Sequence, residues 1–208
     1  MTKNFTNSFI FTLAITVLFT ACGGGTTKTE TANTETVATE TTYTVDATSS
    51  IVAWIGEVAG VYGHNGVIKI ASGSVSAKGD QITGGTVTID MTTIVPLDSA
   101  SFSAEHPASD LVGHLATGDF FLTEEFPTAT FVIKSFEGTK LVGDLTVKGI
   151  TKEETAEVTS IATTETSLSA EALLVFNRQD YKVSWVHYMQ DMILSDDITI
   201  NLNIKATK

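Results

Sequence analysis

The chain has 208 residues, a formal net charge of -12 and an isoelectric point near 4.6. Binding to a phosphate backbone requires clustered Lys and Arg, and 12 basic residues against 24 acidic ones do not supply such clusters. This balance argues against a nucleic-acid partner. Once an N-terminal leader is set aside, the length suits one domain with a sizeable core.

The first 21 residues have the pattern of a signal peptide. Lys3 precedes a mostly apolar run over residues 5–19, which is too short for a membrane-spanning helix because such a helix needs about 20 apolar residues. Two small residues then precede Cys22, the single cysteine of the chain, and this arrangement resembles the lipobox of bacterial lipoproteins. The alternative is a plain signal peptide followed by an incidental cysteine.

The lipobox resemblance implies that Cys22 is acylated and becomes the first residue of the mature protein, so that acyl chains attach it to a membrane. We therefore expect an extracytoplasmic, membrane-anchored lipoprotein that faces the periplasm or the cell surface. Gly23 after the cysteine favours the outer membrane in organisms that sort lipoproteins by this residue.

Residues 22–42 have a different composition from the rest of the chain. After Cys22 the segment is rich in Gly, Thr and Glu, has no aromatic residue, and contains only Val37 as a large aliphatic one. Because such a segment cannot bury a core, we predict a disordered tether over 22–42. The alternative is a polar surface loop of the domain that follows.

From Tyr43 onward the hydrophobic residues repeat with a period of two, which is typical of strands with one buried face. The clearest example is residues 198–205, where aliphatic and polar residues alternate without exception. Gly-containing turns separate such runs, at residues 78–80 and 137–139. The same period predicts nine inward-facing residues, namely Trp54, Val87, Ile89, Phe131, Ile133, Leu145, Val147, Ile200 and Leu202.

Many short strands with almost no helical pattern indicate an all-β sandwich or barrel. The alternation fails between Ser99 and Phe121. Within this stretch, residues 109–115 predict one short helix, with Ser109 as its N-cap and Leu111 and Leu115 one helical turn apart.

Four motifs in order resemble the YceI family. Between His114 and Phe131 the chain reads HLATGDFFLTEEFPTATF, which is similar to the family signature of His-Leu, Asp-Phe-Phe, an aromatic-Pro step and Thr-Phe. Further matches are Tyr43–Asp46, Gly143–Thr151, and Asn177–Tyr181 followed by Trp185. Together they cover essentially residues 43–208.

The chain also departs from the family pattern at several positions. Ala116 and Thr117 stand where basic residues are usual, and Leu122 stands where Asp is common. Tyr181 and Lys182 replace Phe and Gly. Details of the family that depend on these positions are not carried over.

The resemblance implies an eight-stranded, extended antiparallel barrel of lipocalin-like architecture over residues 43–208, with an elongated apolar cavity for a polyisoprenoid such as a quinone tail. A barrel of about eight strands is wide enough for one slender ligand. The nine inward-facing residues are candidates to line this cavity, and Phe120 and Phe121 are candidates for its mouth. The alternatives are a core filled by side chains and a local packing role for the two phenylalanines.

Polar residues give no pattern for catalysis. The four histidines, His64, His106, His114 and His187, match no zinc spacing, and a structural role is preferred for His114. Asp110, Asp119 and Asp180 lack a partner set for acid-base work, and Asp180 is expected to pair with Arg178 or a neighbouring strand. We therefore predict no enzyme, no metal, and no cofactor other than a bound isoprenoid lipid or quinone.

The expected function is binding of such a lipid for storage, transport or envelope stress tolerance. The alternative is an envelope interaction module with a filled barrel. The sequence leaves the oligomeric state open, with a homodimer among the options.

Overall fold

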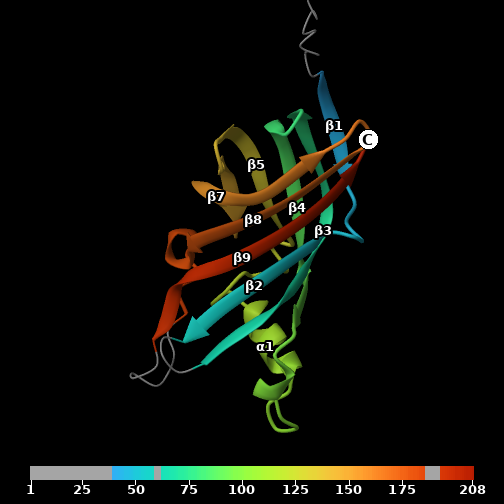
Figure 1. Cartoon of the computed structure of the whole chain (residues 1–208). Helices are drawn as coiled ribbons and strands as arrows, with labels where there is room; N and C mark the ends of the chain where they lie inside the picture. The colour runs from blue at the N-terminus through green and yellow to red at the C-terminus, as the bar shows by residue number, and fades with distance from the viewer. Residues whose placement is uncertain (1–38, 59–61, 186–192) are drawn as a thin grey trace, which may run out of the picture. The chain divides into compact units, whose positions relative to one another are not determined.

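The computed structural model describes residues 39–58, 62–185 and 193–208, which fall in one compact unit over Val37–Lys208. Strands dominate this part of the chain (Figure 1). Its strands are β1 (Glu40–Val45), β2 (Ile51–Val58), β3 (Tyr62–Lys78), β4 (Gln81–Pro96), β5 (Thr128–Glu137), β6 (Lys140–Val147), β7 (Ile150–Thr163), β8 (Ser167–Asn177) and β9 (Leu194–Thr207).

The strands form a closed antiparallel barrel. Each strand from β4 to β9 pairs with the next, β9 pairs with β2, β2 with β3, and β3 returns to β4. Because β1 and β2 share one position in this ring, the barrel has eight strand positions, as the family resemblance implied. The expected all-β fold is therefore confirmed, and the described residues contain a single short α-helix.

β1 and β2 are two halves of one interrupted strand. Both run antiparallel to β3, β1 along residues 74–78 and β2 along residues 62–68. The interruption is a turn in which Asp46 Oδ1 accepts hydrogen bonds from the backbone N–H groups of Thr48 at 2.9 Å and Ser49 at 3.1 Å. Residues 40–42, predicted as part of the tether, belong to β1 because they pair with the end of β3.

Glycine allows the tight turns that join neighbouring strands. Gly79, Gly138 and Gly149 lie in two-residue turns after β3, β5 and β6, with φ values of 61°, 63° and 71°. The left-handed region is open to glycine without steric cost, and such turns match the twist of paired strands. The turns predicted at residues 78–80 and 137–139 are therefore present.

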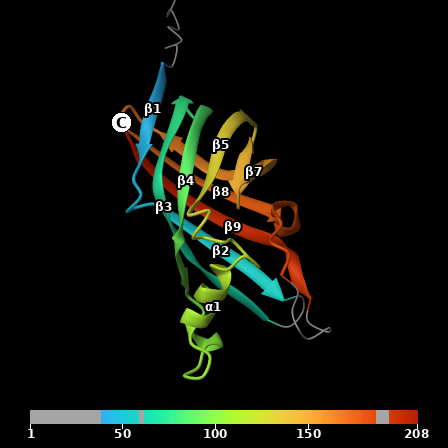
Figure 2. The same cartoon turned by 180° about the vertical axis from the view of Figure 1, so that it is seen from behind.

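One long connection interrupts the strand pattern between β4 and β5, as predicted. It contains a short 3-10 helix, η1 (Ser99–Ser101), and the helix α1 (Ala108–Leu115). The prediction of Ser109 as N-cap is wrong, because the helix begins at Ala108 and its N-cap is Pro107, which makes no side-chain capping bond. α1 lies at one end of the barrel, opposite the end that holds β1 and the C-terminus (Figures 1 and 2).

Arg178, the only arginine of the chain, joins a second 3-10 helix, η2 (Arg178–Tyr181), to β9. Its side chain is buried and donates to the carbonyls of Val183 at 2.6 Å and Ser195 at 2.8 Å. Its carboxylate partner is Asp196, at 3.2 Å. The suggested pair with Asp180 is therefore wrong, since the arginine side chain extends toward the start of β9.

Candidate ligand cavity

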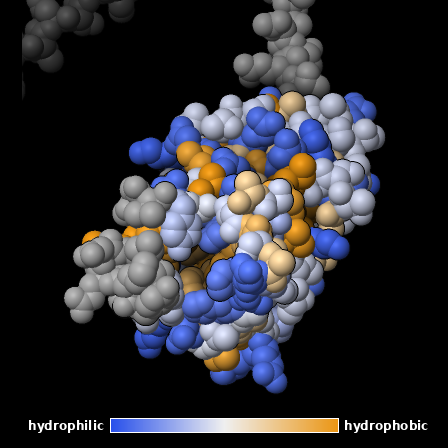
Figure 3. Space-filling model, turned by 90° about the horizontal axis from the view of Figure 1, so that it is seen from below, coloured by the Kyte–Doolittle hydropathy of each residue, from blue (hydrophilic) through white to orange (hydrophobic). Residues whose placement is uncertain are grey.

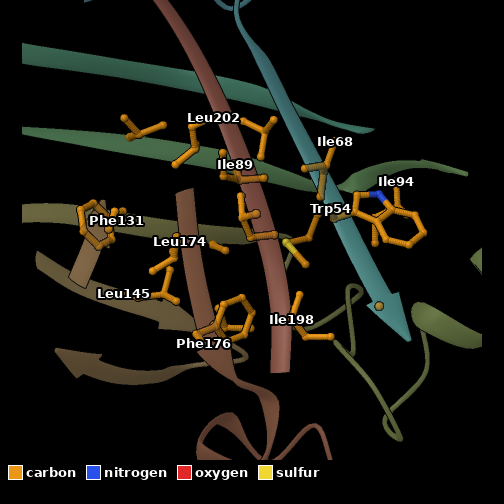
Figure 4. A pocket seen from close by; sticks show the side chains of 18 of the residues that line it. Trp54, Ile68, Ile89, Ile94, Phe131, Leu145, Leu174, Phe176, Ile198 and Leu202 are labelled. Carbon is orange, nitrogen blue, oxygen red and sulfur yellow. The ribbon is translucent and has the colours of Figure 1, made fainter. Parts of the chain in front are cut away.

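The barrel encloses a cavity of about 350 Å³. Side chains from β2, β3, β4, β5, β6, β8 and β9 converge on it (Figure 4). The volume lies within the range of about 300–1,000 Å³ that small-molecule sites in proteins occupy. The interior of this barrel is therefore not completely filled by its own side chains.

All eleven residues predicted for the cavity lie around it. They include the nine inward-facing strand residues and both phenylalanines after α1. They are Trp54, Val87, Ile89, Phe120, Phe121, Phe131, Ile133, Leu145, Val147, Ile200 and Leu202.

The alternation of β9 explains this placement most simply. Ile198, Ile200, Leu202 and Ile204 line the cavity, and the polar residues between them do not. Successive side chains of a strand point to opposite faces, so one face of β9 forms the cavity wall and the other meets solvent.

Other lining residues were not predicted, and β8 shows why. Leu174 and Phe176 face the cavity, whereas their neighbours Leu173 and Val175 lie on the outer face, 37% and 44% exposed. A continuous apolar run over residues 172–176 hides the alternation. Further unpredicted residues on the wall include Ile68, Ile94, Leu111, Leu115, Val183, Trp185 and Leu194.

Two glycines make room for aromatic residues on the cavity wall. Gly66 pairs with Trp54 across β2 and β3, and a Cβ atom at Gly66 would lie 2.6 Å from the indole ring. A Cβ atom at Gly143 in β6 would lie 2.5 Å from the ring of Phe131 in β5. The absence of a side chain at these two positions therefore allows the flat rings to lie against the sheet.

An aromatic cluster lies where α1 meets the barrel. The ring centroids of His114 and Phe120 are 5.0 Å apart, and those of His114 and Trp185 are 4.9 Å apart, both with edge-to-face geometry. Phe120 is 8% exposed and also lines the cavity, so it combines local packing with a place on the wall. Neither of the two roles considered for Phe120 excludes the other.

Polar side chains are rare on the wall. Apart from the two indoles, those among the described residues belong to Tyr62, His64, His114 and Thr130, and no Asp, Glu, Lys or Arg contributes. The described wall therefore has no lysine, arginine or carboxylate to form an ion pair with a charged ligand. Seen from the end at which α1 lies, hydrophobic residues surround a recess, and hydrophilic residues occupy much of the surface around it (Figure 3).

His64 is the most firmly held polar group on the wall. Its Nδ1 lies 2.7 Å from Asp98 Oδ2, and its ring stacks on Phe102 at 5.4 Å between centroids. Tyr62 approaches the same ring edge-on at 5.5 Å. Asp98 begins the connection that carries α1, so the pair joins β3 to this connection.

Asp98 has a pKa below its ordinary value. Burial raises the pKa, but hydrogen bonds from His64, Ser101 and the backbone N–H of Asn65 outweigh burial and favour the carboxylate. Because a carboxylate only accepts hydrogen bonds, Nδ1 of His64 carries the proton between the two groups. Nε2 is then the ring nitrogen left for another partner.

The other candidate polar residues do not gather into a second site. His106 is exposed and does not line the cavity, and His187 and Cys22 lie outside the described residues. Over residues 39–58, 62–185 and 193–208, no three His, Cys, Asp or Glu side chains are placed to hold a metal ion. No helix in the described ranges has the length and apolar character to cross a bilayer.

A closed barrel of eight antiparallel strands around an apolar cavity places the molecule in the lipocalin-like class of barrels. Residues 43–206 match the model of the YceI-like domain. The chain belongs to this family, as the four motifs suggested.

Solved structures show the same fold. BcnA from Burkholderia cenocepacia is 22% identical, with a TM-score of 0.63 over 78% of this chain and 99% of that one. A polyisoprenoid binding domain from Saccharophagus degradans, implicated in plant cell wall breakdown, is 11% identical, with a TM-score of 0.55 over 82% of this chain and 98% of that one.

Curated relatives match over a shorter stretch. UPF0312 proteins from Staphylococcus aureus strains USA300 and NCTC 8325 / PS 47 are 52% identical over 66 residues, which is 32% of this chain and 36% of theirs. The match therefore spans about a third of the length of these relatives.

Proposed function

We propose that this protein is an extracytoplasmic lipoprotein that binds a long apolar isoprenoid lipid, of the quinone or polyprenyl type, inside its barrel. Binding would serve storage, transport or envelope stress tolerance. The observation that carries the proposal is the cavity of about 350 Å³, whose described wall has no ionisable acid, lysine or arginine. An isoprenoid chain has almost no polar atoms, so it loses no hydrogen bonds when it leaves water for such a wall.

The family adds independent support. The solved domain from Saccharophagus degradans is described as a polyisoprenoid binding domain, and this chain shares its fold. The alternative of an interaction module with a filled barrel is less favoured, because side chains leave a cavity of ligand size at the centre.

We propose binding and not catalysis. In the described part of the chain, the His64–Asp98 pair is the arrangement nearest to a catalytic one, since a carboxylate orients the imidazole. No described hydroxyl or thiol is hydrogen-bonded to the other ring nitrogen of His64, so the pair lacks the nucleophile that acyl-transfer sites place there.

Lipid extraction tests the binding proposal. The full-length chain is produced in a bacterial host that exports it, purified in mild detergent, and extracted with organic solvent for mass spectrometry. We expect an isoprenoid lipid near one per protein, enriched over the envelope lipids of the same host. A clean extract that stays clean after incubation with quinones and polyprenyl lipids would favour the filled-barrel alternative.

Membrane attachment needs a separate test. Replacing Cys22 by serine should abolish labelling by a fatty-acid analogue and move the protein from the membrane fraction to the soluble fraction of the envelope. Thr27→Ser, in the same segment but outside the lipobox pattern, should change neither result. Retention of Cys22→Ser in the membrane fraction would contradict the proposed anchor.

A further inference from the structure

Both histidines of the cavity wall lie close to the connection that carries α1. His64 is bonded to Asp98 and stacked on Phe102, both in the connection that carries α1, and His114 belongs to α1 itself. The residues labelled in Figure 4 along the rest of the wall are aliphatic or aromatic. The two histidines therefore lie at the α1 end of a cavity whose described wall is mostly apolar, with Tyr62 and Thr130 as its other polar side chains besides the two indoles.

From this distribution we infer that the ligand carries an uncharged, hydrogen-bonding head group, such as a hydroxyl or a carbonyl, and that His64 binds this head group while the chain occupies the apolar interior. The inference rests on the proposed function and deepens it. It also predicts which isoprenoids the cavity rejects, namely those with a phosphate or diphosphate head group.

His64 has the chemistry for such a contact. Asp98 fixes Nδ1 as the donor between the two residues, and Phe102 and Tyr62 hold the ring plane from two directions. The remaining nitrogen, Nε2, accepts from a hydroxyl when the ring is neutral and donates to a carbonyl when the ring is protonated. A ring held in this way needs little reorganisation to bind a head group.

The surroundings of His64 disfavour a head group with a negative charge. No Lys or Arg is present on the described wall to neutralise a phosphate, and the carboxylate of Asp98, 10% exposed, lies directly behind His64. Burying an anion without a partner is costly, and a nearby carboxylate adds repulsion. The formal net charge of -12 acts in the same direction at longer range.

Three ligands with the same isoprenoid skeleton test the inference on the full-length protein after its lipid has been removed. They are geranylgeraniol, geranylgeranyl diphosphate and the saturated hydrocarbon phytane. Trp54 and Trp185 line the cavity, so a shift in the wavelength or intensity of tryptophan emission reports binding of each ligand. We expect geranylgeraniol to bind at least about tenfold more tightly than the diphosphate.

Variants then assign the contact. His64→Phe keeps an aromatic ring against Phe102, and it should weaken geranylgeraniol binding by about five- to tenfold, the usual value of one hydrogen bond, while phytane binding stays unchanged. Unchanged phytane binding also shows that the variant folds. His106→Gln, an exposed histidine outside the cavity, should behave like the original protein with all three ligands.

Each other outcome has a defined meaning. Equal binding of the alcohol and the diphosphate would overturn the inference, as would a His64→Phe protein with an unchanged ratio of geranylgeraniol to phytane affinity. If His114→Phe lost the preference for geranylgeraniol over phytane and His64→Phe kept it, the head group would bind at His114, and the assignment to His64 would be overturned. Failure of all three ligands to bind would count against the proposed function itself.

Discussion

Lys182 holds a left-handed backbone conformation, with φ of 54°, at the residue that ends η2. A side chain in this region costs roughly 1–2 kcal/mol, which glycine avoids. Its side chain is exposed, and its hydrogen bonds come from the backbone: its N–H donates to the carbonyl of Gln179 at 3.0 Å, and its carbonyl accepts from Lys148 Nζ at 3.0 Å. The backbone at Lys182 therefore adopts a conformation that glycine would adopt without steric cost.

Replacing Lys182 by glycine should therefore stabilise the protein by about 1 kcal/mol, measured by urea unfolding. Lys182→Ala, which keeps the Cβ atom, serves as the control and should leave the free energy of unfolding nearly unchanged. If alanine stabilised the protein as much as glycine does, the lysine side chain and not the backbone would be the source of the strain.

Tyr181 is fully buried, and its hydroxyl donates a hydrogen bond to Glu154 Oε1 at 2.8 Å. Burial, with the bond to Glu154 and the nearby negative charges, raises the pKa of Tyr181 far above its ordinary value of 10.0. The folded protein thus keeps a proton that the unfolded chain loses at alkaline pH. The corresponding stability is present below pH 10 and declines above it.

We expect the free energy of unfolding to fall above pH 10 by up to about 1.4 kcal/mol per pH unit because of this one group. Tyr181→Phe should be less stable at neutral pH, because it loses the bond to Glu154, but should show a flatter decline between pH 9 and pH 11. Tyr62→Phe, at an exposed residue, should retain the original slope. Equal slopes in all three proteins would contradict the argument.

At the scale of the strand, packing of glycine against aromatic rings shapes the cavity wall. Gly143 lies beneath Phe131, and a Cβ atom there would lie 2.5 Å from the ring and 2.6 Å from the carbonyl oxygen of Val132. Gly84 in β4 provides a natural comparison, because a Cβ atom at that residue would have no neighbour within 4 Å. Close neighbours therefore exclude a side chain at Gly143, whereas no neighbour excludes one at Gly84.

Gly143→Ala should destabilise the protein by about 1–3 kcal/mol, since Phe131 must move off its rotamer toward the cavity or the strands must separate. Gly84→Ala should be neutral or stabilising by up to about 1 kcal/mol, through the lower entropy of its unfolded chain. Thermal unfolding of both proteins measures the difference. Equal melting temperatures would mean that Phe131 has space that the structure does not show.

Strand patterns predicted the elements best where one face is polar. Residues 198–205 of β9 alternate without exception, so their cavity face could be read directly, whereas β8 has apolar residues on both faces. The N-cap of α1 was misplaced by two residues, because Ser109 is a good N-cap by composition although the observed N-cap is Pro107. Local sequence does not decide between two plausible starts so close together.

Contacts between polar side chains far apart in the sequence could not be predicted at all. His64 and Asp98 are 34 residues apart, and Arg178 and Asp196 are 18 apart, so neither pair has a spacing signal. His64 and Asp98 meet because β3 pairs with β4, and Arg178 and Asp196 meet because β8 pairs with β9. The family resemblance supplied the barrel and its cavity, and the inward residues followed from the alternation, but the polar groups on the wall depend on tertiary contacts.

At the scale of the whole molecule, the barrel wall has one face toward the cavity and one face toward solvent, and neighbouring residues of a strand lie on different faces. Leu174 lines the cavity, whereas Leu173 lies on the outer face and is 37% exposed. The same substitution at these two residues places the same bulk on opposite sides of the barrel wall.

Leu174→Trp should fill part of the cavity, reduce the copurified or added isoprenoid by at least about tenfold, and cost about 1–3 kcal/mol of stability. Leu173→Trp should keep the ligand and most of the stability. Lipid extraction and melting temperature are measured on both proteins. Loss of ligand in both would indicate that the lipid binds on the outer face or that the barrel tolerates neither change.

The pairing of β2 with β9 has a consequence for the timing of assembly. Residues 51–58 hydrogen-bond with residues 194–203, so a growing chain has no closed wall until β9 has left the ribosome and any export channel. Contacts between such distant segments generally slow folding. Until then the future lining is exposed to water and open to chaperones. We expect lipid to enter as β9 inserts or afterwards, so a chain that stops before Leu194 should acquire no ligand in a pulse-labelling experiment.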